Sequence, residues 1–113
     1  MSEVIEDLDG TVLEYTYEEL GRVRVTLEGG RVAFEWLEGP LQGERGEGYE
    51  YRCQKLGDQQ FFVNWHEPEQ PGLVTLVYDF GRRTVASSVL AFYGTENEQR
   101  LFETGTIHSV ERL

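Results

Sequence analysis

Apolar and polar residues alternate along much of this chain, in short runs separated by Gly, Asp, Asn and Pro. A period of two is typical of β-strands that bury one face. The clearest run places Val23, Val25 and Leu27 on one face, with Arg, Thr and Glu residues between them, and Gly29-Gly30 follows at once. Two glycines between alternating runs indicate a hairpin turn. The pattern predicts antiparallel strands joined by tight turns.

The expected strands cover residues 11–17, 22–28, 31–36, 49–54, 59–66, 73–80, 83–93 and 101–110. The glycine-rich segment 37–48 between two of them is predicted to be a loop or an irregular, bulged strand. No segment has the length and amphipathic pattern of a helix. An open sheet of about eight strands would expose two edges, and closure removes them. We therefore predict an all-β fold, a single antiparallel up-and-down barrel of the lipocalin or calycin kind, over residues 1–113.

The amino-acid composition excludes several classes of binding partner. Ten Lys and Arg against 21 Asp and Glu give a net charge of −11, which repels nucleic acid and anionic membranes and keeps a small protein in solution. No run approaches the ~20 apolar residues of a membrane span, and residues 1–10 are acidic, unlike a signal segment. We expect a cytoplasmic protein in which the lone Cys53 is a small buried hydrophobe.

Whether the barrel is hollow decides whether it has a site. A barrel of about eight strands has room either for its own side chains or for one small ligand. Several aromatic residues fall on the faces predicted to point inward, and such residues typically line ligand pockets. The residues expected to line a pocket are Leu13, Tyr15, Tyr17, Phe34, Trp36, Tyr51, Val63 and Trp65.

Glu67 is the strongest candidate for chemistry. If the alternation continues past Trp65, its carboxyl points into the interior, where an apolar environment raises the pKa and makes the group a proton donor near neutral pH. Alternatively, pairing ends at Trp65 and Glu67 is a solvated loop residue. Tyr15 and Tyr17 share a face, so their hydroxyls either donate to one ligand oxygen or find partners within a packed core.

Motifs for phosphate binding, nucleophilic catalysis or metal binding are absent. The two histidines, His66 and His108, fall on different predicted strands. A metal site would require both to converge with carboxylates, so we expect two partly exposed histidines, no metal site and no cofactor.

Two segments resemble known families. Residues 10–18, which contain Tyr-Thr-Tyr, and residues 63–68, which contain Trp-His-Glu-Pro, resemble strands of the bacterial phenolic acid decarboxylases and of the related calycin-like domains of molybdenum cofactor biosynthesis protein F (MoaF). The likeness extends to residues 74–80 and to the last strand. It implies a closed barrel that needs no cofactor.

The resemblance also implies roles for individual residues. Tyr15 and Tyr17 match the tyrosine pair that grips the substrate carboxylate, and Glu67 matches the glutamate that protonates the alkene carbon before carbon dioxide leaves. The family's arginine aligns with Glu44, however, and Arg45 lies one residue later. A shift of one residue turns a side chain to the opposite face unless a bulge intervenes, so either Glu44 or Arg45 faces the pocket.

Three functional hypotheses follow. The leading one is a MoaF-like barrel that binds a small aromatic or amphipathic molecule through the residues above and Arg45. The second is a cofactor-independent lyase, a decarboxylase or related proton-transfer enzyme, with Glu67 as acid. The third is a solid barrel that acts as an interaction module or homodimer, because the strands at 73–80 and 83–93 are apolar on both faces and leave Leu90 and Phe92 in an outward patch.

Overall fold

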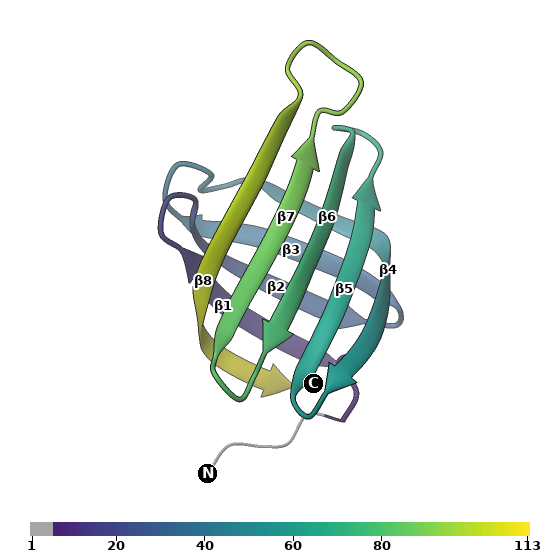
Figure 1. Cartoon of the computed structure of the whole chain (residues 1–113), viewed down its shortest axis with the longest axis vertical. Coiled ribbons are helices and arrows are strands. Elements are labelled where there is room, and N and C mark those ends of the chain that lie inside the picture. The colour runs from purple at the N-terminus through teal and green to yellow at the C-terminus, as the bar shows by residue number, and fades with distance from the viewer. Residues whose placement is uncertain (1–5) are drawn as a thin grey trace.

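A computed structural model describes residues 6–113, which form a closed barrel of antiparallel strands in chain order (Figure 1). Each strand pairs with its neighbours in sequence, and β1 pairs with β8 to close the ring. The strands are β1 (Thr11–Tyr17), β2 (Gly21–Glu28), β3 (Arg31–Glu38), β4 (Arg45–Gly57), β5 (Gln60–Glu67), β6 (Gly72–Asp79), β7 (Thr84–Ala91) and β8 (Gln99–Arg112). The predicted all-β, up-and-down barrel is confirmed.

The largest departure from the predicted elements is at the start of β4. The strand begins at Arg45, inside the glycine-rich segment, and a bulge in the β3–β4 pairing lies between Val32 and Phe34. Gly46 pairs with Phe34, and a Cβ atom at Gly46 would lie 2.8 Å from the Phe34 ring. The missing side chain therefore lets the strand run directly over this ring.

One end of the barrel is packed shut. Leu8, which precedes β1, is 1% exposed and joins Leu13, Leu27 and Phe61 in a core of fully buried side chains. Asp9 fixes this end, because its carboxylate accepts hydrogen bonds from the backbone N–H of Gly29 and Gly30, at 2.9 Å each, and from the Tyr51 hydroxyl at 2.6 Å. The β2–β3 hairpin is thereby tied to the segment before β1.

The opposite end carries the two longest connections, between β3 and β4 and between β7 and β8, and also the β5–β6 loop (Figure 1). Two of its turns meet at glycines. A Cβ atom at Gly21 would lie 2.0 Å from the carbonyl oxygen of Glu38, and one at Gly39 would lie 2.7 Å from the Gly21 Cα. Both glycines have positive φ, which other residues rarely adopt. This contact draws the β1–β2 turn against the β3–β4 loop.

Two expectations about single residues are wrong. Cys53 is exposed rather than buried. Leu90 and Phe92 do not form one outward patch, because β7 ends at Ala91 and Phe92 has a φ of 54°, which breaks the alternation. Phe92 lies instead at the mouth of an interior cavity. The exposed apolar residues of the outer face include Phe62, Leu73 and Phe102.

Two sequence predictions concern membranes and signals. Within residues 6–113, no helix is long and apolar enough to cross a membrane. The expectation that residues 1–10 are not a signal segment falls partly outside the described residues, since the structure describes none before Glu6.

Candidate functional site

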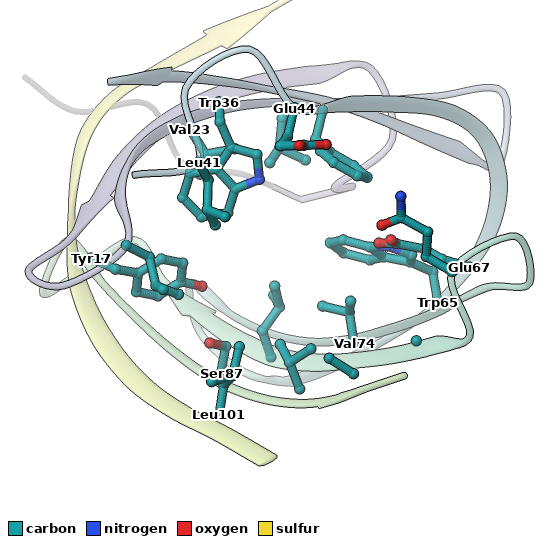
Figure 2. A pocket seen from close by; sticks show the side chains of 18 of the residues that line it. Tyr17, Val23, Trp36, Leu41, Glu44, Trp65, Glu67, Val74, Ser87 and Leu101 are labelled. Carbon is teal, nitrogen blue, oxygen red and sulfur yellow. The ribbon is translucent and has the colours of Figure 1, made fainter. Parts of the chain in front are cut away.

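The half of the barrel away from Leu8 encloses a cavity of about 680 Å³ (Figure 2). Every strand contributes to its wall. The lining residues are Tyr15, Tyr17, Leu20, Val23, Val25, Phe34, Trp36, Leu41, Glu44, Arg45, Tyr49, Trp65, Glu67, Glu69, Gln70, Gly72, Val74, Leu76, Ser87, Val89, Ala91, Phe92, Gln99 and Leu101. Volumes of roughly 300–1,000 Å³ are typical of sites for small organic molecules, which are lined by apolar groups with a few polar ones.

Buried tyrosine hydroxyls lie in and beside the cavity wall. The Tyr15 and Tyr78 hydroxyls share a hydrogen bond of 2.9 Å, and both residues are at most 2% exposed. The Tyr17 and Ser87 hydroxyls point toward one another (Figure 2). Burial raises the pKa of Tyr15 and raises that of Tyr17 to about 12. These phenols therefore remain neutral near pH 7.

Trp65 and Glu67 form the opposite wall (Figure 2). Strand β5 pairs with β6 as far as Glu67, which faces Gly72, so the alternation continues past Trp65 and places both side chains at the cavity. The Trp65 indole Nε1–H donates a hydrogen bond of 2.8 Å to Oε2 of Glu67. Burial raises the pKa of Glu67, although this hydrogen bond opposes the change. Glu67 is thus a partly desolvated carboxyl group in contact with an aromatic ring.

Aromatic rings cover much of the remaining wall. The ring centroids of Tyr17 and Trp36 lie 6.3 Å apart, and Phe34 stacks on Tyr49 at the same distance. Trp36 lies beside Val23 and Leu41 on the wall opposite Ser87 and Leu101 (Figure 2). The cavity therefore offers several π faces to a ligand.

Acidic groups outnumber basic ones at this site. Glu44, Glu67 and Glu69 line it, and among the described lining residues Arg45 alone carries a positive charge. The Tyr49 hydroxyl donates to Oε2 of Glu69 at 3.1 Å. Burial, followed by this hydrogen bond to Glu69, raises the pKa of Tyr49 to about 12. The sequence left open whether Glu44 or Arg45 faces the pocket. In the structure both residues line the cavity.

The structure brings most of the predicted site residues together. Tyr15, Tyr17, Phe34, Trp36, Arg45, Trp65 and Glu67 all line the cavity. Leu13 and Val63 share the inward faces of β1 and β5 but lie in the packed core, at 0% and 1% exposure. Tyr51 lies at the closed end with its hydroxyl on Asp9.

The sequence did not indicate that several other residues line the cavity. Ser87 lies on the inward face of β7, but this strand is apolar on both faces, so alternation does not reveal which face is inward. Leu41, Glu69, Gln70 and Phe92 come from loops, whose side-chain directions follow no period.

The histidines lie away from the cavity and from each other. His66 Nε2 is 2.7 Å from the Tyr93 hydroxyl, and His108 Nε2 is 2.7 Å from Oγ1 of Thr16. Residues 6–113 contain no group of three or more His, Cys, Asp or Glu side chains placed to hold a metal ion.

Closed topology, one packed end and a cavity at the other define a calycin-like β-barrel. The chain belongs to the MoaF-like family, whose sequence profile matches residues 7–109. No curated protein matches the sequence. Among solved structures, the chain is similar to one described as a "putative beta-lactamase" from Burkholderia vietnamiensis, with a TM-score of 0.79 and 19% identity over 95% of this chain and 98% of that one. This likeness supports the fold alone.

Proposed function

We propose that this protein binds a small aromatic or amphipathic molecule in the cavity between Tyr17 and Glu67. The observation that carries the proposal is the interior volume of about 680 Å³ in a barrel whose other half is tightly packed. A barrel of eight strands has room either for its own side chains or for one small ligand, and here the side chains leave one half unfilled.

The lining supports the same proposal. Aromatic and aliphatic side chains from all eight strands supply contact area, and a small number of polar groups are held in place by other residues. Trp65 orients Glu67, and Tyr49 orients Glu69. Fixed polar groups in an apolar cavity give a ligand one preferred orientation.

Tryptophan fluorescence tests this proposal directly. The chain has two tryptophans, Trp36 and Trp65, and both line the cavity, so every tryptophan signal reports on this site. We expect at least one member of a panel of small aromatic amines, alcohols and acids to change the emission with a saturable dependence on concentration. Emission that stays constant across the panel would contradict the proposal.

A second candidate function is proton transfer by Glu67, in a cofactor-free decarboxylation or a related reaction. The observation that favours it is the position of a partly buried carboxyl group at an aromatic cavity, where burial raises the pKa of Glu67 and so favours the protonated form that a general acid needs. Two observations weigh against a phenolic acid as the substrate. Glu44 and Glu69 repel a carboxylate, and the Tyr15 hydroxyl is bonded to Tyr78.

Incubation with p-coumarate or ferulate distinguishes the two candidates. Decarboxylation by Glu67 predicts release of carbon dioxide by the native protein, and none by Glu67→Gln, which keeps the size of the side chain and an acceptor for Trp65. A protein that binds without catalysis releases none in either form.

A further inference from the structure

The charge of the cavity lining carries an inference about the class of ligand, which rests on the proposed binding function. Three carboxyl groups, of Glu44, Glu67 and Glu69, share this space with one guanidinium, of Arg45. Figure 2 shows Glu44 and Glu67 on neighbouring parts of the wall, with Trp65 beside Glu67. Glu67 is half-buried, whereas Glu44, Glu69 and Arg45 are exposed to solvent. An excess of negative charge around a cleft attracts cations and repels anions, most strongly at low salt.

Two of the carboxyl groups are held by aromatic donors. Trp65 donates to Oε2 of Glu67 and Tyr49 donates to Oε2 of Glu69, at 2.8 Å and 3.1 Å. A carboxylate fixed through one oxygen loses little further freedom when its other oxygen accepts a hydrogen bond. Oε1 of Glu67 and Oε1 of Glu69 are therefore well suited to receive an ammonium group.

The aromatic rings point to the same class of ligand. The faces of tryptophan, tyrosine and phenylalanine attract cations through the ring quadrupole, most strongly for tryptophan, and several such rings around one space are a known way to bind organic ammonium ions. Trp36, Trp65, Tyr17, Phe34 and Tyr49 all line this cavity. The rings and the carboxylates together favour a ligand that combines an apolar part with a positively charged group.

We infer that the cavity selects organic cations, molecules with an apolar body of about one aromatic ring and a protonated amine or quaternary ammonium group. The apolar body contacts Val23, Val74 and Leu101, and the cation lies between the Trp65 ring and the carboxylates of Glu67 and Glu69. Anions of the same shape are excluded.

A matched series of three probes tests this inference by isothermal titration calorimetry at neutral pH and low salt. The probes are 3-phenylpropylamine, 3-phenylpropan-1-ol and 3-phenylpropionate, which share one body and differ in the charge of the end group. We expect the amine to bind about tenfold more tightly than the alcohol, which corresponds to about 1.4 kcal/mol, and the carboxylate to bind more weakly than either.

Variants then locate the source of the selectivity. We expect Glu67→Gln and Glu69→Gln each to reduce the preference for amine over alcohol severalfold. Glu111→Gln, an exposed substitution on β8 at the closed end, should preserve the preference. Circular dichroism of each variant identifies any that fails to fold. If one of Glu67→Gln and Glu69→Gln fails to fold, the preference measured for the other variant tests the inference.

The outcomes separate the two proposals. If none of the three probes binds, the proposed binding function fails, and this inference fails with it. If the alcohol or the carboxylate binds as tightly as the amine, or if both acidic variants keep the full preference, the inference is overturned while the binding function stands.

Discussion

Glu67 Oε2 lies 2.8 Å from the indole nitrogen of Trp65, two residues earlier on the same strand. Side chains two apart on a strand point to the same face, so β5 itself places a proton donor and a carboxyl group side by side at the cavity. The bond fixes the indole edge and one carboxyl oxygen, and burial raises the pKa of Glu67 despite it. In this pair a titratable group and an aromatic surface lie in direct contact.

The raised pKa makes a prediction about stability. The folded protein holds the Glu67 proton at pH values where the unfolded chain, with the ordinary pKa of 4.5, has released it. The stabilising effect of that proton is complete below the unfolded pKa and is lost as pH rises through the folded one. Glutamine carries no titratable proton, so in Glu67→Gln the free energy of unfolding does not fall with rising pH for this reason. We expect Glu67→Gln to gain stability relative to the native protein between about pH 5 and about pH 8, as the native carboxyl group loses its proton.

Urea denaturation at the two pH values measures this difference. Glu111→Gln is the control, because it removes one negative charge from an exposed position and should show no comparable change with pH. A Glu67→Gln protein that is equally stable relative to the native one at both pH values would show that burial of this carboxyl group has no energetic effect.

The buried tyrosine pair makes a second prediction. Tyr15→Phe leaves the fully buried Tyr78 hydroxyl without its 2.9 Å partner, and Tyr78→Phe removes the same bond from Tyr15. Each change should cost about 1–2 kcal/mol of unfolding free energy. The double variant should cost less than the sum, since it leaves neither hydroxyl unpaired. Strict additivity of the three measured values would mean that the two hydroxyls do not interact.

A third prediction uses the two faces of β7. Ala91 lines the mouth of the cavity, whereas Ala86 on the same strand is exposed on the outer face. Ala91→Phe should fill part of the entrance and weaken ligand binding at least about tenfold. Ala86→Phe adds the same volume outside and should leave binding unchanged. Equal effects of the two substitutions in a fluorescence titration would place the ligand elsewhere.

The closed end makes a fourth prediction. Asp9 accepts bonds from two backbone N–H groups and from Tyr51, and the Tyr51 bond is the largest cause that lowers its pKa. In Asp9→Asn an amide N–H₂ group faces one of these donors, and we expect a loss of about 1–2 kcal/mol at neutral pH. The loss should fade as pH falls through the lowered pKa of Asp9, because the native carboxylate is then protonated too.

Denaturation of Asp9→Asn beside Asp58→Asn measures this effect. Asp58 lies in an exposed turn between β4 and β5, so its substitution should have little effect. Similar losses for the two variants would mean that the hydrogen bonds of Asp9 contribute nothing to the closed end.

The sequence predicted the barrel well because alternation is a direct consequence of strand geometry. Residues such as Val23, Val25 and Leu27 are buried where the pattern expects them. Alternation assigns a face but no depth along the barrel axis. Leu13 and Tyr15 therefore look equivalent in sequence, although Leu13 belongs to the packed core and Tyr15 faces the cavity.

The features of the site that the sequence did not predict lie in loops and at local irregularities of the strands. Phe92 left its expected face because its φ is positive, and Glu44 and Arg45 both reach the cavity at a loop and bulged strand start. Glu69, the third acidic residue of the lining, could not be predicted from the alternation. Glu69 lies two residues beyond β5 in the loop that carries Pro68 and Pro71, where no periodicity predicts the direction of a side chain.

The central claim is that a small molecule occupies the cavity, and the two indole N–H groups test it most directly. In a ¹H–¹⁵N spectrum, the signals of Trp36 and Trp65 are the two indole resonances of the chain. We predict that titration with 3-phenylpropylamine moves both in a saturable manner, with the larger change at Trp65, whose Nε1–H is bonded to Glu67. Indole signals that stay in place while backbone signals of the outer face move would contradict the account.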